Sequence, residues 1–228
     1  MSSSSSSNNS SNKKTKVQTA EILREYGPFE GAGNVGGVTH DGKQVWAAAG
    51  SKLLAFDPVS GQQTGAIERE ADAGTAFDGK YLYQIAEARI DKIDPASGKV
   101  VHSIPAPSQG GDSGLTWAEG SLWVGAYRDR KIHQINPETG ALIRSIDSNR
   151  FVTGVTWVDG QLWHGTWEGD ESDIRRIDPT SGAVLDQLQM PSGTAVSGLE
   201  SDGADVFYAG GGNSGKVRAV RRPKAVAA

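Results

Sequence analysis

Gly154-Val-Thr-Trp-Val-Asp-Gly160 is the stretch that decides the fold, because four other parts of the chain repeat its pattern. Each copy starts with glycine and ends in Asp-Gly or Glu-Gly, a tight hairpin signal since glycine accepts positive φ. The other copies occupy residues 37–42, 74–79, 114–120 and 198–203. Successive closing glycines are 37, 41, 40 and 43 residues apart, which matches the roughly 40–45 residues of a four-stranded propeller blade.

The rest of each unit also repeats. An aliphatic–aromatic pair follows each copy and predicts a second strand. The pairs are Val45–Trp46, Leu82–Tyr83, Leu122–Trp123, Leu162–Trp163 and Val206–Phe207. A third strand then leads into a Pro-x-Ser/Thr-Gly turn in the first four units, at residues 58–61, 95–98, 137–140 and 179–182. Fourth strands are expected near residues 62–67, 99–104, 141–146 and 183–188.

The fifth unit lacks a fourth strand of its own. The segment Glu21-Ile-Leu-Arg-Glu-Tyr26 has the apolar spacing of the other fourth strands, so we expect it to complete the last blade and close the ring. Closure removes the strand edges that an open array would expose. The sequence therefore predicts an all-β, five-bladed propeller over residues 15–223, followed by a tail at 224–228.

Composition and charge argue against several classes of partner and binding site. The chain has 228 residues, 23 Lys+Arg against 27 Asp+Glu, and no Cys. A net charge of −4 argues against nucleic-acid and membrane-surface partners, and the absence of Cys rules out disulfides and zinc–thiolate sites. No apolar run approaches a membrane span. We expect a soluble monomer.

The first 14 residues are rich in serine and asparagine. This composition predicts disorder, and the segment resembles an expression leader or tag. If it replaced a native signal, the protein is periplasmic or secreted; the compartment is otherwise unknown.

A functional site is expected where the repeat breaks. The repeated tryptophans, Trp46, Trp123 and Trp163, are interpreted as packing between blades. Non-repeated residues gather instead on the face that carries the connections between strands two and three, the longest being residues 164–173. They are Gln84, Glu87, Tyr127, Arg128, His164, Trp167, Glu168 and Tyr208. These residues suggest a pocket with aromatic walls and polar anchors, although solvated loops are equally polar.

No sequence motif indicates metal binding, nucleophilic catalysis or phosphate binding. The four histidines occupy different repeat positions, and no HExxH, paired Cys or GxSxG motif is present. The glycine-rich stretch at residues 210–215 is not followed by a helical pattern, so it does not predict a phosphate loop. No cofactor is expected, and a metal bound by backbone carbonyls in the channel stays open.

The five-unit layout resembles the glutamine cyclotransferase family, the plant and bacterial type of glutaminyl cyclase, which is a five-bladed propeller. The likeness is most visible from Thr153 to Trp167 and in Ile174-Arg-Arg-Ile-Asp-Pro-Thr-Ser-Gly182. The family has Asn-Glu-Leu-Glu, Asn-Val-Trp and Ile-x-x-Ile-Asp-Pro-x-Thr-Gly at these places. The resemblance implies that Trp167 is a pocket residue.

The sequence departs from this family at its polar positions. Ala47 and Ala73 stand where the family has Glu, and Glu87 falls on one of its pocket tryptophans. The residues that precede the five first-strand glycines are all small, namely Gly36, Ala73, Ser113, Thr153 and Ser197. If they face the channel mouth, the acid–base groups that cyclisation of an N-terminal Gln needs are missing.

Three functions follow as hypotheses. The first is a divergent relative that binds a small molecule or peptide at the channel mouth without the family's catalytic acid. The second is an active glutaminyl-peptide cyclotransferase, an acyltransferase that uses Glu87 as its catalytic group. The third is a non-catalytic interaction scaffold. In the first two, the ligand-binding residues are Trp167, Gln84, Tyr127, Arg128, His164, Glu168 and Tyr208.

Overall fold

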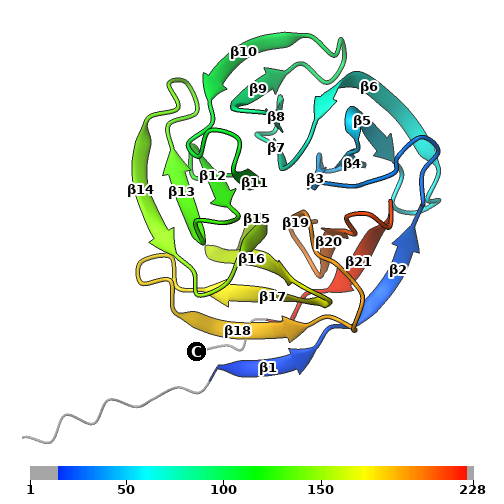
Figure 1. The fold of residues 1–228 in the computed structure, drawn as a ribbon. Helices are drawn as coiled ribbons and strands as arrows, with labels where there is room; N and C mark the ends of the chain where they lie inside the picture. Colours follow the sequence, from blue (N-terminus) through cyan, green and yellow to red (C-terminus); the bar gives the residue numbers. More distant parts are fainter. Residues whose placement is uncertain (1–14, 225–228) are drawn as a thin grey trace, which may run out of the picture.

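The computed structural model describes residues 15–224 as a ring of five antiparallel sheets around a central channel (Figure 1). The predicted leader at residues 1–14 and most of the predicted tail lie outside the described residues. Blade I contains β3 (Gly37–His40), β4 (Val45–Ala48), β5 (Gly50–Phe56) and β6 (Gln63–Ala71). Blade II contains β7 (Thr75–Phe77), β8 (Leu82–Ala86), β9 (Arg89–Ile93) and β10 (Val100–Pro105). Blade III contains β11 (Asp112–Ala118), β12 (Ser121–Ala126), β13 (Lys131–Ile135) and β14 (Leu142–Asp147).

The N-terminal segment closes the ring as predicted. Blade IV contains β15 (Val152–Val158), β16 (Gln161–Glu168), β17 (Glu171–Ile177) and β18 (Val184–Gln189). Blade V contains β19 (Leu199–Ser201), β20 (Val206–Gly210), β21 (Val217–Arg221) and, as its outer strand, β2 (Ile22–Tyr26). An additional strand, β1 (Lys16–Thr19), pairs in parallel with β18 outside blade IV (Figure 1). This fifth strand was not predicted from the sequence.

A ring of glycines explains why the first-strand glycine repeats. A Cβ atom at Gly154 would clash with the backbone nitrogen of Leu199 in the next blade, and one at Gly114 would clash with the carbonyl oxygen of Thr153. Gly37, Gly74 and Gly198 face the next blade's backbone in the same way. Glycine at this position therefore allows the inner strands to approach closely around the channel.

Aromatic side chains of the second strands pack against the next blade. The rings of Tyr83 and Trp117 stack at 5.7 Å, and those of Trp123 and Trp157 at 5.1 Å. Burial of such large side chains is the main source of stability between blades. In residues 15–224 there is no helix long and apolar enough to cross a membrane.

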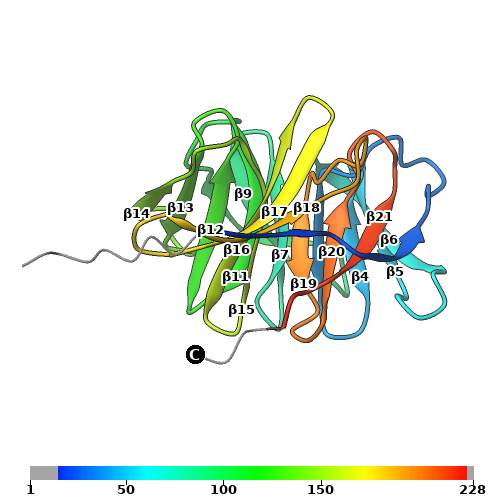
Figure 2. The same cartoon turned by 90° about the horizontal axis from the view of Figure 1, so that it is seen from below.

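Two details of the predicted blades are wrong. In blade V the side chain equivalent to Trp123 is Tyr208 rather than Phe207, because Tyr208 pairs with first-strand residue Glu200 as Trp123 pairs with Thr116. In blade IV the predicted long connection over residues 164–173 is a two-residue turn, since β16 and β17 extend through most of it. This long hairpin projects from the upper face of the ring in Figure 2.

Candidate binding site at the channel mouth

A cavity of about 370 Å³ lies at the mouth of the channel, on the face of the blade-to-blade connections. Its lining includes all five small residues that precede the first-strand glycines: Gly36, Ala73, Ser113, Thr153 and Ser197. The remaining lining residues are Asn34, Asp72, Asp112, Tyr127 and Trp167. The expectation that the small residues face the mouth is confirmed, and their small volume creates the cavity.

Two of the three hydroxyl groups on the cavity floor are used in structure, whereas the buried Thr153 hydroxyl has no hydrogen-bond partner among the described residues. Ser113 Oγ donates to the carbonyl of Val152 at 2.7 Å, and Ser197 Oγ donates to the carbonyl of Val35. Each bond joins one blade to the start of the next, at the first residue of β15 for Val152 and just before β3 for Val35. The hydroxyls of Ser113 and Ser197 are therefore poorly placed to act as nucleophiles or proton carriers.

Trp167 and Tyr127 form the aromatic part of the wall. Trp167 stands at the end of β16, and its ring lies against Gly212, where a Cβ atom would be 2.9 Å from the six-membered ring. Its indole N–H donates to the carbonyl of Gly169 at 3.0 Å. Tyr127 donates its hydroxyl to the carbonyl of Trp167 at 2.9 Å and packs on Phe151 at 4.8 Å. The two aromatic side chains are thus held together across blades III and IV.

Asp72 and Asp112 make the cavity acidic. Asp112 is 8% exposed, and burial raises the pKa of its carboxyl, opposed by hydrogen bonds from Ser108. Asp72 is exposed and accepts a hydrogen bond from the backbone N–H of Glu87 at 2.9 Å. Within residues 15–224 neither aspartate forms a salt bridge, and the lining contains no Lys or Arg. The cavity consequently favours a ligand with a positive charge.

Both aspartates were missed by the sequence analysis, although a signal was present. They stand two residues before the first-strand glycine, where the other three blades have Val35, Val152 and Val196. Replacement of the repeated valine by aspartate in two blades identifies this position as part of the cavity lining. The small residues one position later identify the lining equally clearly.

The predicted catalytic residue Glu87 does not line the cavity. It occupies the turn between β8 and β9 with a φ of 54°, and its side chain is 71% exposed. Its nearest cation is Arg89, at 3.7 Å. Its backbone rather than its carboxylate contacts the site, through Asp72.

Two other predicted residues lie beside the cavity. Glu168 turns toward blade III, where it accepts a hydrogen bond from the Phe151 N–H at 2.9 Å and pairs with Arg150 at 3.2 Å. Arg128 is exposed and lines a smaller neighbouring cavity of about 310 Å³ that shares Asp112 with the mouth.

Three predicted residues are buried in strands rather than exposed in connections. Gln84 donates its amide to the carbonyl of Ala73 at 3.0 Å and so supports the cavity floor from below. His164 is fully buried, and burial lowers its pKa to about 4, so the imidazole is neutral. Tyr208 is 5% exposed within the packing between blades V and I. None of the three lines the cavity.

A third unpredicted carboxylate lies deeper in the channel. Glu200 of β19 accepts hydrogen bonds from Thr39 in blade I at 3.0 Å and from Thr156 in blade IV at 2.5 Å. Burial raises its pKa to about 7. The other blades have Thr39, Ala76, Thr116 and Thr156 at this repeat position. Among the described residues no three His, Asp or Glu side chains are grouped closely enough to hold a metal ion.

The fold and the mouth cavity define a small five-bladed propeller with a candidate binding site at one end of its channel. A glutaminyl cyclase from Myxococcus xanthus has a similar structure, with a TM-score of 0.76, 17% identity and coverage of 91% of this chain and 98% of that chain. The β-propeller domain of Cps50 (Swd1) from Myceliophteria thermophila aligns with a TM-score of 0.58, 9% identity and coverage of 90% and 100%. A chain of the mitotic checkpoint complex aligns with a TM-score of 0.52, 14% identity and coverage of 82% and 74%.

These similarities concern the fold. The first confirms the resemblance that the sequence predicted, and its low identity fits a divergent protein. No protein-family model and no curated protein matches the sequence.

Proposed function

We propose that the protein binds a small molecule or the end of a peptide at the channel mouth, and that it lacks the acid–base group of the glutamine cyclotransferases. The observation that carries this proposal is the cavity itself. Five small side chains leave room above the channel, and Trp167 provides an apolar wall. Concave sites of this kind, with aromatic walls and few polar anchors, are the usual sites for small ligands.

The charge of the site suggests which ligands to test first. Asp72 and Asp112 favour a positively charged group, and a cation beside Trp167 or Tyr127 gains further attraction from the aromatic ring. The likeness to a glutaminyl cyclase supports peptides with an N-terminal Gln as the first probes. A peptide with a free amino terminus combines both features.

The test compares Gln-initiated dipeptides with free and with acetylated amino termini, by calorimetric titration and by release of ammonia. We expect the free peptides to bind more tightly, because Asp72 and Asp112 attract an amino terminus. We expect no ammonia release, because Ala47 and Ala73 stand where the family has its carboxylates; release that is lost in Asp112→Asn would instead make Asp112 the acid–base group. Trp167→Ala and Asp112→Asn are expected to weaken binding about tenfold each. Val59→Ala, at a site that is 83% exposed and remote from the cavity, is the control.

Turnover that survives Glu87→Gln would show that another group performs the chemistry, and turnover that is lost in this variant would support a cyclase. Equal binding by the wild type and both cavity variants would falsify the mouth as the binding site.

A further inference from the structure

The five blades share a row of side chains that crosses each sheet at its second-strand aromatic residue. Strand pairing places one residue of strand three and one of strand four beside each aromatic side chain. From strand two outward, the rows are Trp46–Ala55–Gly65, Tyr83–Lys92–His102, Trp123–Gln134–Arg144, Trp163–Arg176–Asp186 and Tyr208–Ala219–Arg24. Four rows contain a basic residue, whereas the row of blade I ends in alanine and glycine.

In three of the other rows a basic residue, Lys92, Arg144 or Arg24, contacts the turn of the next blade. In blade IV, Arg176 pairs with Asp186 of its own row. Arg144 lies over the ring of Trp123, with 5.0 Å between Cζ and the ring centroid, and also donates to the carbonyl of Pro179 in the turn of blade IV. Arg24 of blade V donates in the same way to the carbonyl of Pro58, at 3.2 Å, in the turn of blade I. In blade III a guanidinium at this place thus satisfies the aromatic face of the row and a turn carbonyl together, whereas Arg24 lies over the ring of Tyr26 on its own strand.

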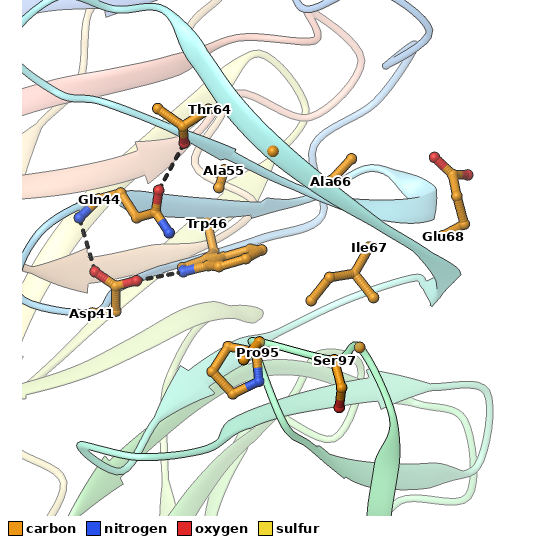
Figure 3. Close-up of a pocket in the computed structure, with 13 residues that line it drawn as sticks. Asp41, Gln44, Trp46, Ala55, Thr64, Ala66, Ile67, Glu68, Pro95 and Ser97 are labelled. Carbon is orange, nitrogen blue, oxygen red and sulfur yellow. Dashed lines mark hydrogen bonds between the residues drawn. The ribbon is translucent and has the colours of Figure 1, made fainter.

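In blade I this place is a groove. Figure 3 shows the indole of Trp46 facing the turn of blade II, and the space between them belongs to a groove of about 640 Å³. Trp46 is 5% exposed, whereas Trp123 is fully buried. Arg69 reaches only the far end of this turn, where it donates to the carbonyl of Gly98 at 3.0 Å. In the part of the chain that the structure describes, no side chain bonds to the carbonyl of Pro95.

The groove is acidic. Asp41 accepts a hydrogen bond from the indole N–H of Trp46 at 2.7 Å, and Glu68 stands at the opposite end of the lining (Figure 3). The lining contains no Lys, Arg or His. Its charge therefore matches a cation, which is the group that the other four rows supply from the chain itself.

Blade IV shows how an additional strand brings a cation into such a row. Its outer strand β18 is covered by β1, which pairs Lys16 with Asp186 in the row of Trp163. The outer strand of blade I, β6, extends over nine residues, and within residues 15–224 its outer edge has no partner strand. An extended peptide can pair with such an edge through its backbone.

We propose that the groove between blades I and II binds an arginine side chain from an extended peptide of a partner protein. The peptide adds a strand to β6, and its guanidinium lies over Trp46 and donates to the carbonyl of Pro95. Asp41 and Glu68 balance its charge. This site lies toward the face opposite the mouth and is independent of the function proposed there.

The test uses a short peptide of alternating Thr and Val with one central Arg, both ends blocked, and a matched peptide with Ala in place of Arg. Fluorescence anisotropy is expected to show about tenfold tighter binding of the Arg peptide. The indole N–H resonance of Trp46 is expected to shift on binding. Equal affinities for the two peptides would overturn the proposal.

Two substitutions at Gly65 test the location of the site. A Cβ atom there meets no other atom within 4 Å, so Gly65→Arg and Gly65→Gln are expected to fold with unchanged unfolding midpoints. Both fill the groove from within and are expected to abolish binding. Leu142→Arg, at a side chain on β14 that is 59% exposed, adds the same charge elsewhere, and this variant is expected to retain peptide binding. Loss in Gly65→Arg with full binding in Gly65→Gln would indicate simple charge repulsion and would also overturn the proposal.

Discussion

Two neighbouring layers of the channel wall are one residue apart in the sequence, yet they differ in how strictly they repeat. In one layer every blade has glycine, because the backbone of the next blade occupies the space of a side chain. In the layer above, the residues are Gly36, Ala73, Ser113, Thr153 and Ser197, and Asp72 and Asp112 stand beside them. Close approach of the blades fixes the first layer, whereas the mouth is free to vary with its ligand.

The largest expected effect comes from the glycine layer. Gly154→Ala places a Cβ atom against the backbone of Leu199, so blades IV and V must separate, and we expect a loss of about 3 kcal/mol in the free energy of unfolding. The measurement is urea unfolding. Gly33→Ala is the control, since a Cβ atom there meets nothing within 4 Å. Similar midpoints for the two variants would show that the glycine layer does not limit how closely the blades approach.

Most of the fold that the glycine layer supports could be predicted from the sequence. The repeat gave the blade number, the strand order and the closure by residues 21–26, because each depends on local turn signals and on spacing. The register of blade V was mispredicted, since its hairpin differs in length and moves the aromatic position from Phe207 to Tyr208. Strand β1 was missed because it is held mainly by backbone pairing and has little apolar pattern.

The mouth was predicted less completely. Trp167 and Tyr127 were found because they interrupt the repeat, and the small residues were found by aligning the five units. Gln84 and His164 were misplaced in connections because polar residues within buried strands look like loop residues in a sequence. Their burial depends on hydrogen bonds to distant residues, which a single sequence does not show.

An effect that reaches a similar size only at the upper end of a pH window is expected from Glu200, one layer below the glycines. Its pKa of about 7 in the folded protein lies above the ordinary value of 4.5. The folded state therefore binds more protons than the unfolded state between these pH values, and stability falls as the pH rises through this window. Glu200→Gln removes this fall. Relative to the wild type, the free energy of unfolding of the variant is expected to increase steadily from pH about 4.5 to 7. The total increase is roughly 3 kcal/mol at most.

The control for this measurement is Glu30→Gln, at an exposed side chain. His164 acts in the opposite direction, since its lowered pKa of about 4 makes stability rise with pH up to about 6.5. Because both proteins contain His164, its contribution cancels in the difference between wild type and variant. A difference that does not change with pH would mean that Glu200 ionises normally in the channel.

The smallest effect is expected at the mouth itself. Tyr127→Phe removes the hydroxyl that donates to the carbonyl of Trp167, and its partly exposed position limits the expected loss of stability to about 1 kcal/mol or less. The fluorine NMR signal of 5-fluorotryptophan at position 167, assigned with Trp167→Phe, is expected to shift because the ring loses its support. Tyr81→Phe removes a hydroxyl that makes no hydrogen bond among residues 15–224 and should leave this signal in place. An unchanged signal in Tyr127→Phe would mean that Gly212 and Gly169 position Trp167 without help from blade III, and the mouth would then depend on fewer contacts than the glycine layer beneath it.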